Sequence, residues 1–306
     1  MASPELSALL TLLGPPQPGA NPSVEMRRAG FLRLSALMLP LPEDVTVTPT
    51  EIGGIPAEVT TIRDAEPPAG TLLFLHGGGF SVGSPLTHRE FVGRLARASG
   101  LRVVSLDYRL APEHPFPSAL DDAGAAYDGV LAAGIPAQSI ALAGDSAGGG
   151  LALSLLLSLR ERGAPLPACA AAICPWADLS LSAPSLDENA RSDPLVQRLS
   201  ASGSVERYLG PSGDPRHPLA SPVFADLAEL PPLFLQATRA ESLRDDALRL
   251  AENARKAGVE VELDLWEDMP HIWPFFAKML PEGRAAIDRV GTFLRRRVKA
   301  PARLRP

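Results

Sequence analysis

The segment LAGDSAGGG at residues 142–150 surrounds one serine hydroxyl with small residues. Glycine adopts positive φ angles without steric cost and lets backbone or ligand approach closely. The segment lacks the Gly-Lys-Ser/Thr ending of a phosphate-binding P-loop and the spacing of a dinucleotide-binding turn. Gly144, Ser146 and Gly148 instead satisfy the pattern G-x-S-x-G, in which a sharp strand-to-helix turn exposes a serine Oγ. We therefore predict that Ser146 is a nucleophile.

A serine hydroxyl needs a general base, and that base needs an orienting carboxylate. Two histidines follow Ser146. His217 lies in a proline-rich segment, whereas His271 directly follows the last predicted strand, and we therefore favour His271 as the base. The acid should follow the strand before it, where Glu241 is nearest to the strand end and Asp245 is the second choice.

Asp245 and Asp246 both fall in the first turn of a predicted helix. Carboxylates in that position interact favourably with the helix dipole. We interpret both side chains as solvated charges, which is a further reason to prefer Glu241 as the acid.

The glycine-rich segment HGGGF at residues 76–80 follows another predicted strand and offers the backbone N–H groups of Gly78 and Gly79. The N–H of Ala147, directly after the nucleophile, adds a third donor. Such donors stabilise the negative charge that develops on a carbonyl oxygen during acyl transfer. We predict that the three form an oxyanion hole and that His76 fixes the loop through hydrogen bonds.

Apolar segments alternate with helical ones from residue 71 onward. We expect strands that begin at residue 71 and span 102–108, 139–146, 168–174, 230–238 and 259–267, and helices at 87–99, 118–133, 147–162, 242–257 and 281–298. This alternation is typical of an α/β fold with a mostly parallel sheet covered by helices on both faces. The strand C-termini then share one edge, where ligands bind, so the predicted site residues meet there.

Two segments depart from this alternation. Residues 1–42 predict two short helices, the second amphipathic at about 23–38, and a β-hairpin follows around Gly53-Gly54. Residues 180–229 are proline-rich without a clear strand, and a stretch of that length favours an inserted lid. We predict a core of residues 46–179 and 226–300, a helical cap of residues 1–45 and 180–225, and a basic tail of residues 301–306.

The composition limits the function classes. A net charge of −6 over 306 residues argues against nucleic-acid binding and against a polybasic membrane anchor. Cys169 and Cys174 are too few for a disulfide framework, and we interpret them as buried residues in a reducing compartment. The sequence has no metal-ligand spacing, so we predict no metal and no cofactor. It also has no secretory leader and no apolar stretch of membrane-spanning length, so we expect a cytoplasmic protein without stable membrane association.

Together these motifs resemble those of the bacterial hormone-sensitive-lipase-like esterases of the α/β-hydrolase superfamily. The segments that carry the resemblance are, in order, HGGGF (76–80), DYRLAPEHPFP (107–117), GDSAGG (144–149), ESLRDD (241–246) and MPH (269–271). The resemblance implies an α/β-hydrolase fold whose eight-stranded sheet is parallel except near its second strand, with a helical cap. It also implies the roles given above to Ser146 and His271 and an acid at position 241, where many members carry aspartate and this chain carries glutamate.

The resemblance further implies a carboxylic ester hydrolase that acts on small-molecule esters with short to medium acyl chains. Arg109, Glu113 and Asp145 are expected to support the loops. We predict that the pocket is lined by Phe80, Trp176, Leu195, Val196, Ile272, Trp273 and Phe275. Alternatives are a non-catalytic ligand-binding protein on the same fold, or a lactonase, amidase or deacetylase that uses the same residues. Members of the family often form homodimers through the edge of the last strand, and we keep such a dimer as an expectation.

Overall fold

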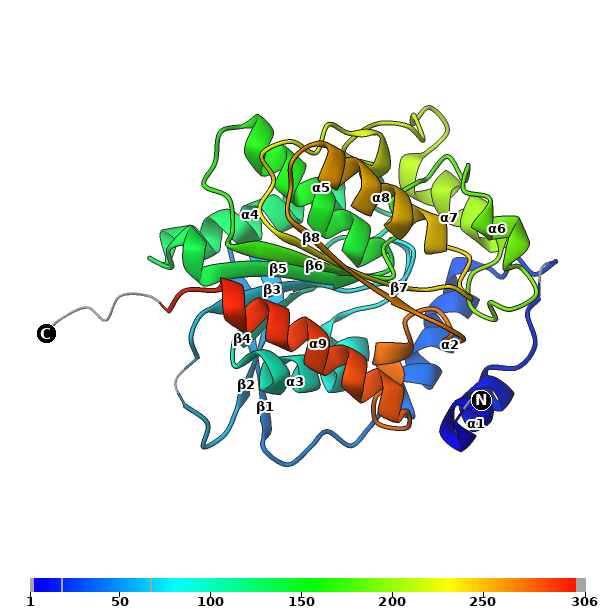
Figure 1. The fold of residues 1–306 in the computed structure, drawn as a ribbon, viewed down its shortest axis with the longest axis horizontal. Helices are drawn as coiled ribbons and strands as arrows, with labels where there is room; N and C mark the ends of the chain where they lie inside the picture. Colours follow the sequence, from blue (N-terminus) through cyan, green and yellow to red (C-terminus); the bar gives the residue numbers. More distant parts are fainter. Residues whose placement is uncertain (1–2, 18, 67, 301–306) are drawn as a thin grey trace, which may run out of the picture.

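The computed structural model describes residues 3–17, 19–66 and 68–300, so the predicted basic tail lies outside the described residues. Its centre is one eight-stranded sheet with the order β1-β2-β4-β3-β5-β6-β7-β8 (Figure 1). Strand β2 runs antiparallel to β1 and β4, and all other neighbours are parallel, as the resemblance implied. The strands are β1 (Val45–Ile52), β2 (Ile55–Ile62), β3 (Thr71–Leu75), β4 (Arg102–Leu106), β5 (Ile140–Asp145), β6 (Cys169–Ile173), β7 (Leu233–Thr238) and β8 (Val261–Trp266).

Strands β3, β5, β6 and β7 are buried along their whole length, whereas every residue of the edge strand β8 is partly exposed. Successive side chains of β3 enter opposite cores, because Leu72 and Phe74 face one hydrophobic cluster and Leu73 and Leu75 face the other. Burial on both faces explains why these strands read as continuous apolar runs. Strand β7 begins three residues later than predicted because two prolines precede it, and proline has no N–H for the ladder.

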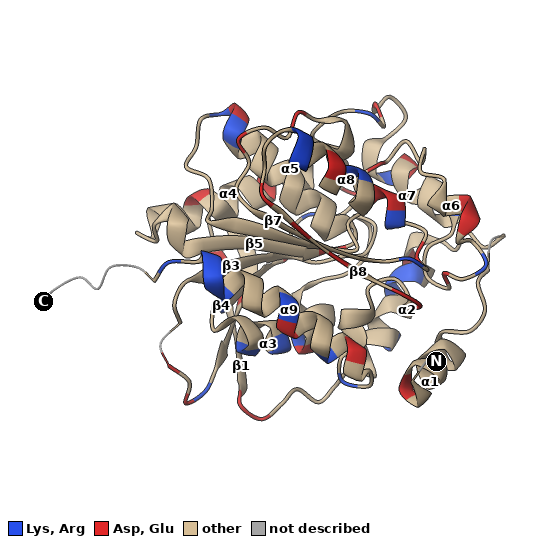
Figure 2. Ribbon diagram, in the orientation of Figure 1, with Lys and Arg blue, Asp and Glu red and all other residues tan. Residues whose placement is uncertain are grey.

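Helices cover both faces of the sheet (Figure 1). One face carries α3 (Pro85–Ser99) and α9 (Pro281–Arg297), and the other carries α4 (Ser118–Ala132), α5 (Ala147–Glu161) and α8 (Arg244–Lys256). Helix α3 begins two residues earlier than predicted because Ser84 and Thr87 form a reciprocal capping box. Figure 2 shows acidic residues on β8 near basic residues of α9, and Arg296 of α9 lies 2.9 Å from the carboxylate of Glu262.

The predicted hairpin is present, with Ile52 of β1 paired with Ile55 of β2. Gly53 and Gly54 connect them with φ angles of 61° and 81°. Two positive φ values are what a tight type I′ hairpin turn requires, and glycine supplies them without strain.

The remaining helices gather at the edge where the parallel strands end (Figure 1). They are α1 (Pro4–Leu13), α2 (Val24–Ala36), α6 (Ser185–Glu188) and α7 (Arg198–Leu209). Short 3₁₀ helices elsewhere in the fold span Ala137–Ser139, directly before β5, and Pro222–Phe224 and Trp273–Phe276. The amphipathic pattern predicted for α2 is only partly correct. Met38 is buried just beyond α2 and Phe31 and Leu34 are half-buried, but Leu37 is 47% exposed. Among the described residues, no helix has both the length and the hydropathy needed to cross a bilayer.

Candidate active site

Ser146 lies on the turn between β5 and α5, at φ 53° and ψ −121°. A non-glycine residue rarely adopts a positive φ, and the surrounding structure must hold it there. Two backbone hydrogen bonds do so. The amide of Ser146 donates to the carbonyl of Ile173 at 2.8 Å, and its carbonyl accepts from the amide of Trp176 at 2.9 Å. The turn therefore fixes the serine where β5 meets α5.

The glycines around Ser146 are required by close backbone contacts. A Cβ on Gly148 would lie 2.0 Å from the carbonyl oxygen of Leu75, and one on Gly144 would lie 2.2 Å from that of Gly148. A Cβ on Gly150 would lie 2.1 Å from the carbonyl oxygen of Trp176. Carbon cannot approach oxygen so closely, so these positions accept no side chain.

Ser146, His271 and Glu241 form one continuous chain of hydrogen bonds. The hydroxyl of Ser146 lies 2.9 Å from Nε2 of His271, whose Nδ1 lies 2.5 Å from Oε2 of Glu241. The other carboxylate oxygen of Glu241 accepts the amide of Thr238 at 2.9 Å. The side chains of all three residues are buried. This is the geometry in which a carboxylate orients an imidazole that can accept a serine proton.

The pKa of His271 is set by two opposing effects. Burial lowers it, whereas the hydrogen bond and negative charge of Glu241, together with the charges of Asp193 and Asp145, raise it by a larger amount. The pKa therefore lies above its ordinary value. A raised pKa strengthens the imidazole as a base and stabilises the imidazolium that forms when it takes a proton.

The other predicted candidates lie elsewhere. The ring of His217 lies 5.2 Å from that of Phe116, and its Nδ1 accepts the amide of Leu219. Asp245, the second choice for the acid, accepts the amide of Ser185 at 2.9 Å.

The interpretation of Asp246 as a solvated charge is wrong, because this carboxylate is buried. It accepts the amides of Ala177 and Asp178, each at 2.8 Å. Burial raises its pKa to about 8. Asp246 therefore anchors the loop that follows β6.

Gly78, Gly79 and Ala147 present their backbone amides near the serine. Gly78 and Gly79 have φ angles of 124° and 60°, and no residue that the structure describes accepts a hydrogen bond from either amide. Ala147 is the first residue of α5, where an amide has no partner within its own helix. The arrangement offers the donors that an oxyanion needs.

Residues behind the glycine loop hold it in place. Asp145 accepts the amide of Gly77 at 2.9 Å, and the hydroxyl of Tyr108 donates to the carbonyl of His76 at 2.6 Å. The ring of His76 stacks on Tyr108 at 4.2 Å, and burial, with the neighbouring His88, lowers its pKa to about 3. His76 is therefore neutral, and its Nδ1 lies 2.8 Å from the carbonyl oxygen of Gly77 in the same loop.

Arg109 and Glu113 also support loops. Arg109 binds the carboxylate of Asp122 on α4 through Nε and Nη2. Both oxygens of Glu113 lie 2.7 Å from terminal nitrogens of Arg28, so this carboxylate joins its loop to α2.

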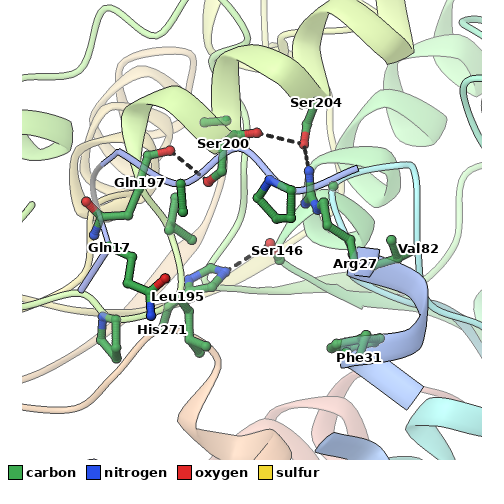
Figure 3. Close-up of a pocket in the computed structure, with 18 of the residues that line it drawn as sticks. Gln17, Arg27, Phe31, Val82, Ser146, Leu195, Gln197, Ser200, Ser204 and His271 are labelled. Atoms are coloured by element: carbon green, nitrogen blue, oxygen red, sulfur yellow. Dashed lines mark hydrogen bonds between the residues drawn. The ribbon is translucent and has the colours of Figure 1, made fainter. Parts of the chain in front are cut away.

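A cavity of about 420 Å³ opens over Ser146 and His271 (Figure 3). Of the predicted lining residues, Trp176, Leu195, Val196 and Ile272 do line it. Sequence reasoning predicted a cap from residues 1–45 and 180–225 but missed which residues of the N-terminal segment and of α7 line the cavity. Those additional residues include Leu13, Gln17, Met26, Arg27, Gly30, Phe31, Leu34, Ser200 and Ser204.

Three predicted lining residues belong to the core instead. Phe80 stacks on Tyr208 with ring centroids 3.8 Å apart, and Trp273 is fully buried. Phe275 is also buried and packs against Phe31, which does reach the pocket. Aromatic rings supply large apolar surfaces, and these three rings bury those surfaces in the hydrophobic core.

One group of residues has metal-ligand chemistry. Ligand atoms of Cys174, Glu241 and His271 lie within 4.8 Å of one another. The carboxylate and imidazole already bind each other, and burial raises the pKa of the Cys174 thiol well above its ordinary value. Metal binding needs a thiolate, so this cluster fits a serine site better than a metal site. Both cysteines are buried and free.

Known proteins are similar to this chain in sequence and in fold. The α/β-hydrolase fold family matches residues 72–275. An acetyl-hydrolase of Streptomyces hygroscopicus is 43% identical over 96% of this chain and 97% of its own, and the carboxylesterase NlhH of Mycobacterium tuberculosis is 32% identical over 98% of each. A crystal structure of an esterase from the bacterial hormone-sensitive lipase family superimposes with a TM-score of 0.92, at 41% identity over 97% of this chain and 99% of that one. The chain belongs to the α/β-hydrolase family, among the bacterial hormone-sensitive-lipase-like esterases.

Proposed function

We propose that this protein is a serine carboxylesterase in which Ser146 is the nucleophile, His271 the general base and Glu241 the orienting acid. The observation that carries the proposal is the unbroken chain of hydrogen bonds from the serine hydroxyl through the imidazole to a buried carboxylate. The names of the related esterases support the same activity.

The reaction proceeds through an acyl-enzyme. His271 takes the proton of Ser146 as Oγ attacks the ester carbonyl, and the resulting oxyanion is bound by the amides of Gly78, Gly79 and Ala147. Collapse of the tetrahedral intermediate expels the alcohol, which takes the proton from His271. Water then attacks the acyl-enzyme with the same base, releasing the acid and restoring the serine.

We infer that the preferred acyl chains are short to medium. A cavity of about 420 Å³ holds a small ester, and one relative at 43% identity is named an acetyl-hydrolase. The α2 and α7 residues on its wall support the proposed cap of residues 1–45 and 180–225, which would select substrates. A homodimer through β8, the partly exposed edge strand, stays a prediction that analytical ultracentrifugation can check. The cytoplasmic location also stays a prediction.

Hydrolysis of p-nitrophenyl esters graded from acetate to palmitate tests the proposal. We expect a maximum at short chains and loss of activity in Ser146→Ala and in Glu241→Ala, with circular dichroism showing that both variants fold. No turnover of any ester by the folded protein would contradict it and favour the ligand-binding alternative. Lactones and anilides in the same panel distinguish a lactonase or amidase, since the same three residues serve all of these reactions.

A further inference from the structure

Arg27 extends from α2 into the wall of the cavity that holds Ser146 and His271. Figure 3 shows its guanidinium bonded to Ser204 of α7, with 2.5 Å between Nη1 and Oγ. A Cβ placed on Gly79 would lie 3.2 Å from Nη2 of Arg27, so the guanidinium lies against the proposed oxyanion loop. Arg27 therefore brings a cation to the space in which an ester would bind.

Arg27 forms no ion pair within the described part of the chain. Its neighbour Arg28 contrasts with it, because two of its nitrogens lie 2.7 Å from the carboxylate oxygens of Glu113. A guanidinium carries five N–H donors, and the hydroxyl of Ser204 accounts for one of those of Arg27. Because Arg27 lies on the cavity wall, its remaining N–H donors can bind a ligand there.

A second cation, Arg207, contacts the same serine as Arg27. Arg207 donates from Nη2 to the same hydroxyl of Ser204 at 3.2 Å, and its buried Nε has no hydrogen-bond partner among the described residues. Burial and the charge of Arg207 together lower the pKa of Arg27 to about 10, so Arg27 is still charged at neutral pH. Two partly buried cations that share one neutral hydroxyl repel each other and make the local electrostatic potential positive. An anionic ligand would reduce this repulsion.

We propose that Arg27 binds a carboxylate on the substrate, so that the enzyme prefers esters that carry a free carboxylate group. This inference rests on the proposed esterase function and specifies its substrate class. The planar guanidinium matches a carboxylate in geometry as well as in charge, and such charge-assisted bonds are the strong ones. The carboxylate belongs to either the acyl or the alcohol part of the ester, and the experiment separates these two cases.

Two matched substrate pairs differ only in a carboxylate and a neutral amide. 4-Acetoxybenzoate and 4-acetoxybenzamide place the group on the alcohol side, and monoethyl glutarate and monoethyl glutaramate place it on the acyl side. We expect kcat/KM of the wild type to favour the carboxylate in at least one pair by about 10- to 100-fold, as hydrogen bonds to charged groups allow.

Arg27→Gln removes the charge but keeps a donor for Ser204, and it should lower that preference at least tenfold. Arg33→Gln is the matched control, because Arg33 lies on the same helix but is exposed and outside the cavity wall. A merely structural role for Arg27 would reduce turnover of both members of a pair equally. Equal reduction, or no preference in either pair of the wild type, would overturn the proposal.

Binding measured by calorimetry tests the same point without turnover. 4-Hydroxybenzoate should bind at least tenfold more tightly than 4-hydroxybenzamide, or unreacted monoethyl glutarate more tightly than monoethyl glutaramate in Ser146→Ala, and Arg27→Gln should abolish the difference. A protein that hydrolyses p-nitrophenyl butyrate but binds acid and amide equally would refute the role of Arg27 and leave the esterase function in place. A protein that hydrolyses no ester but keeps the difference would refute the esterase and retain the anion site.

Discussion

The floor and the wall of the cavity are built in different ways. The floor consists of Ser146 and Glu241, which follow the buried strands β5 and β7, and of His271, which lies on the loop after the edge strand β8. One chain of hydrogen bonds joins the three side chains. The wall consists largely of α2, α7 and the segments beside them. Helix α2 is joined to the loop of Glu113 by a surface ion pair between Arg28 and Glu113, whose side chains are 36% and 52% exposed.

Apolar exposure follows the same division. Six large apolar side chains before residue 40 are at least a third exposed, namely Leu10, Leu12, Met26, Leu32, Leu37 and Leu39. Strands β5 and β7, which precede Ser146 and Glu241, are buried along their whole length. A rigid floor positions reacting atoms, whereas a wall with few buried contacts can open and vary. Substitutions in the floor should therefore have large effects on catalysis, and those in the wall should act mainly on substrate binding.

The largest expected effect is on the floor, in Glu241→Gln. The amide cannot orient the required tautomer of His271 or stabilise the imidazolium, so kcat should fall by about 10⁴-fold. Turnover of p-nitrophenyl butyrate measures the change. Asp245→Asn is the control, because that carboxylate binds the amide of Ser185 instead of His271, and it should alter kcat less than threefold. If Asp245→Asn were the more damaging change, the assignment of the acid would be wrong.

A second large effect is expected for Gly148→Ala. Its Cβ would lie 2.0 Å from the carbonyl oxygen of Leu75, so the turn at Ser146 must shift. We expect a loss of several kcal/mol in the free energy of unfolding, as overpacking a core entails, together with loss of activity. Urea denaturation and ester turnover measure both.

Gly124→Ala is the matched control for Gly148→Ala. Gly124 is also helical, but a Cβ there has open space around it. Alanine is the better helix former, so this variant should gain about 0.5–1 kcal/mol. Comparable losses in the two variants would show that the glycines near Ser146 are not there for steric clearance.

These residues also show what a sequence can predict. The glycines and Ser146 lie within one short segment, and the geometry of the turn depends on that segment and on adjacent strands. Glu241 was predicted as the acid because a carboxylate at the end of a parallel strand lies at the edge where ligands bind. The strand and helix pattern was readable for a similar reason, since burial on two faces leaves continuous apolar runs.

The cavity-lining residues of α2 and α7 could not be predicted in this way, because their contacts join distant segments. The bond between Arg27 and Ser204 spans 177 positions, and no local pattern specifies it. Asp246 has the sequence position of a solvated first-turn charge, yet its partners are amides 68 and 69 positions away. Phe80 and Trp273 have the chemistry of pocket residues, but tertiary packing places both in the core.

The pH dependence of kcat/KM should report the protonation of His271 in the cavity floor. As the pH falls through the pKa of His271, Nε2 takes a proton from solvent and can no longer accept that of Ser146, so activity falls. The charge of Glu241 holds that pKa above its ordinary value of 6.5, and half-maximal activity should therefore lie above pH 6.5. Circular dichroism over the same range excludes acid unfolding as the cause. A half-maximal point at or below pH 6.5 would contradict the coupling between Glu241 and His271.

The smallest expected effect is in the wall, for Glu113→Gln. An ion pair this exposed contributes about 0–1 kcal/mol to stability. The free energy of unfolding, measured by urea denaturation, should therefore fall by no more than that amount. The pair nevertheless holds α2, which carries Arg27 and Phe31 on the cavity wall. We therefore expect KM for short esters to rise about two- to threefold with kcat unchanged, the pattern of lost uniform binding.

Asp44→Asn is the control for Glu113→Gln, because the pair of Asp44 with Arg97 is similarly exposed but touches no element of the cavity wall. It should change stability as little and leave KM unaltered. If Glu113→Gln lowered kcat instead of raising KM, α2 would be positioning the reacting groups themselves, and the division between a catalytic floor and a selective wall would fail.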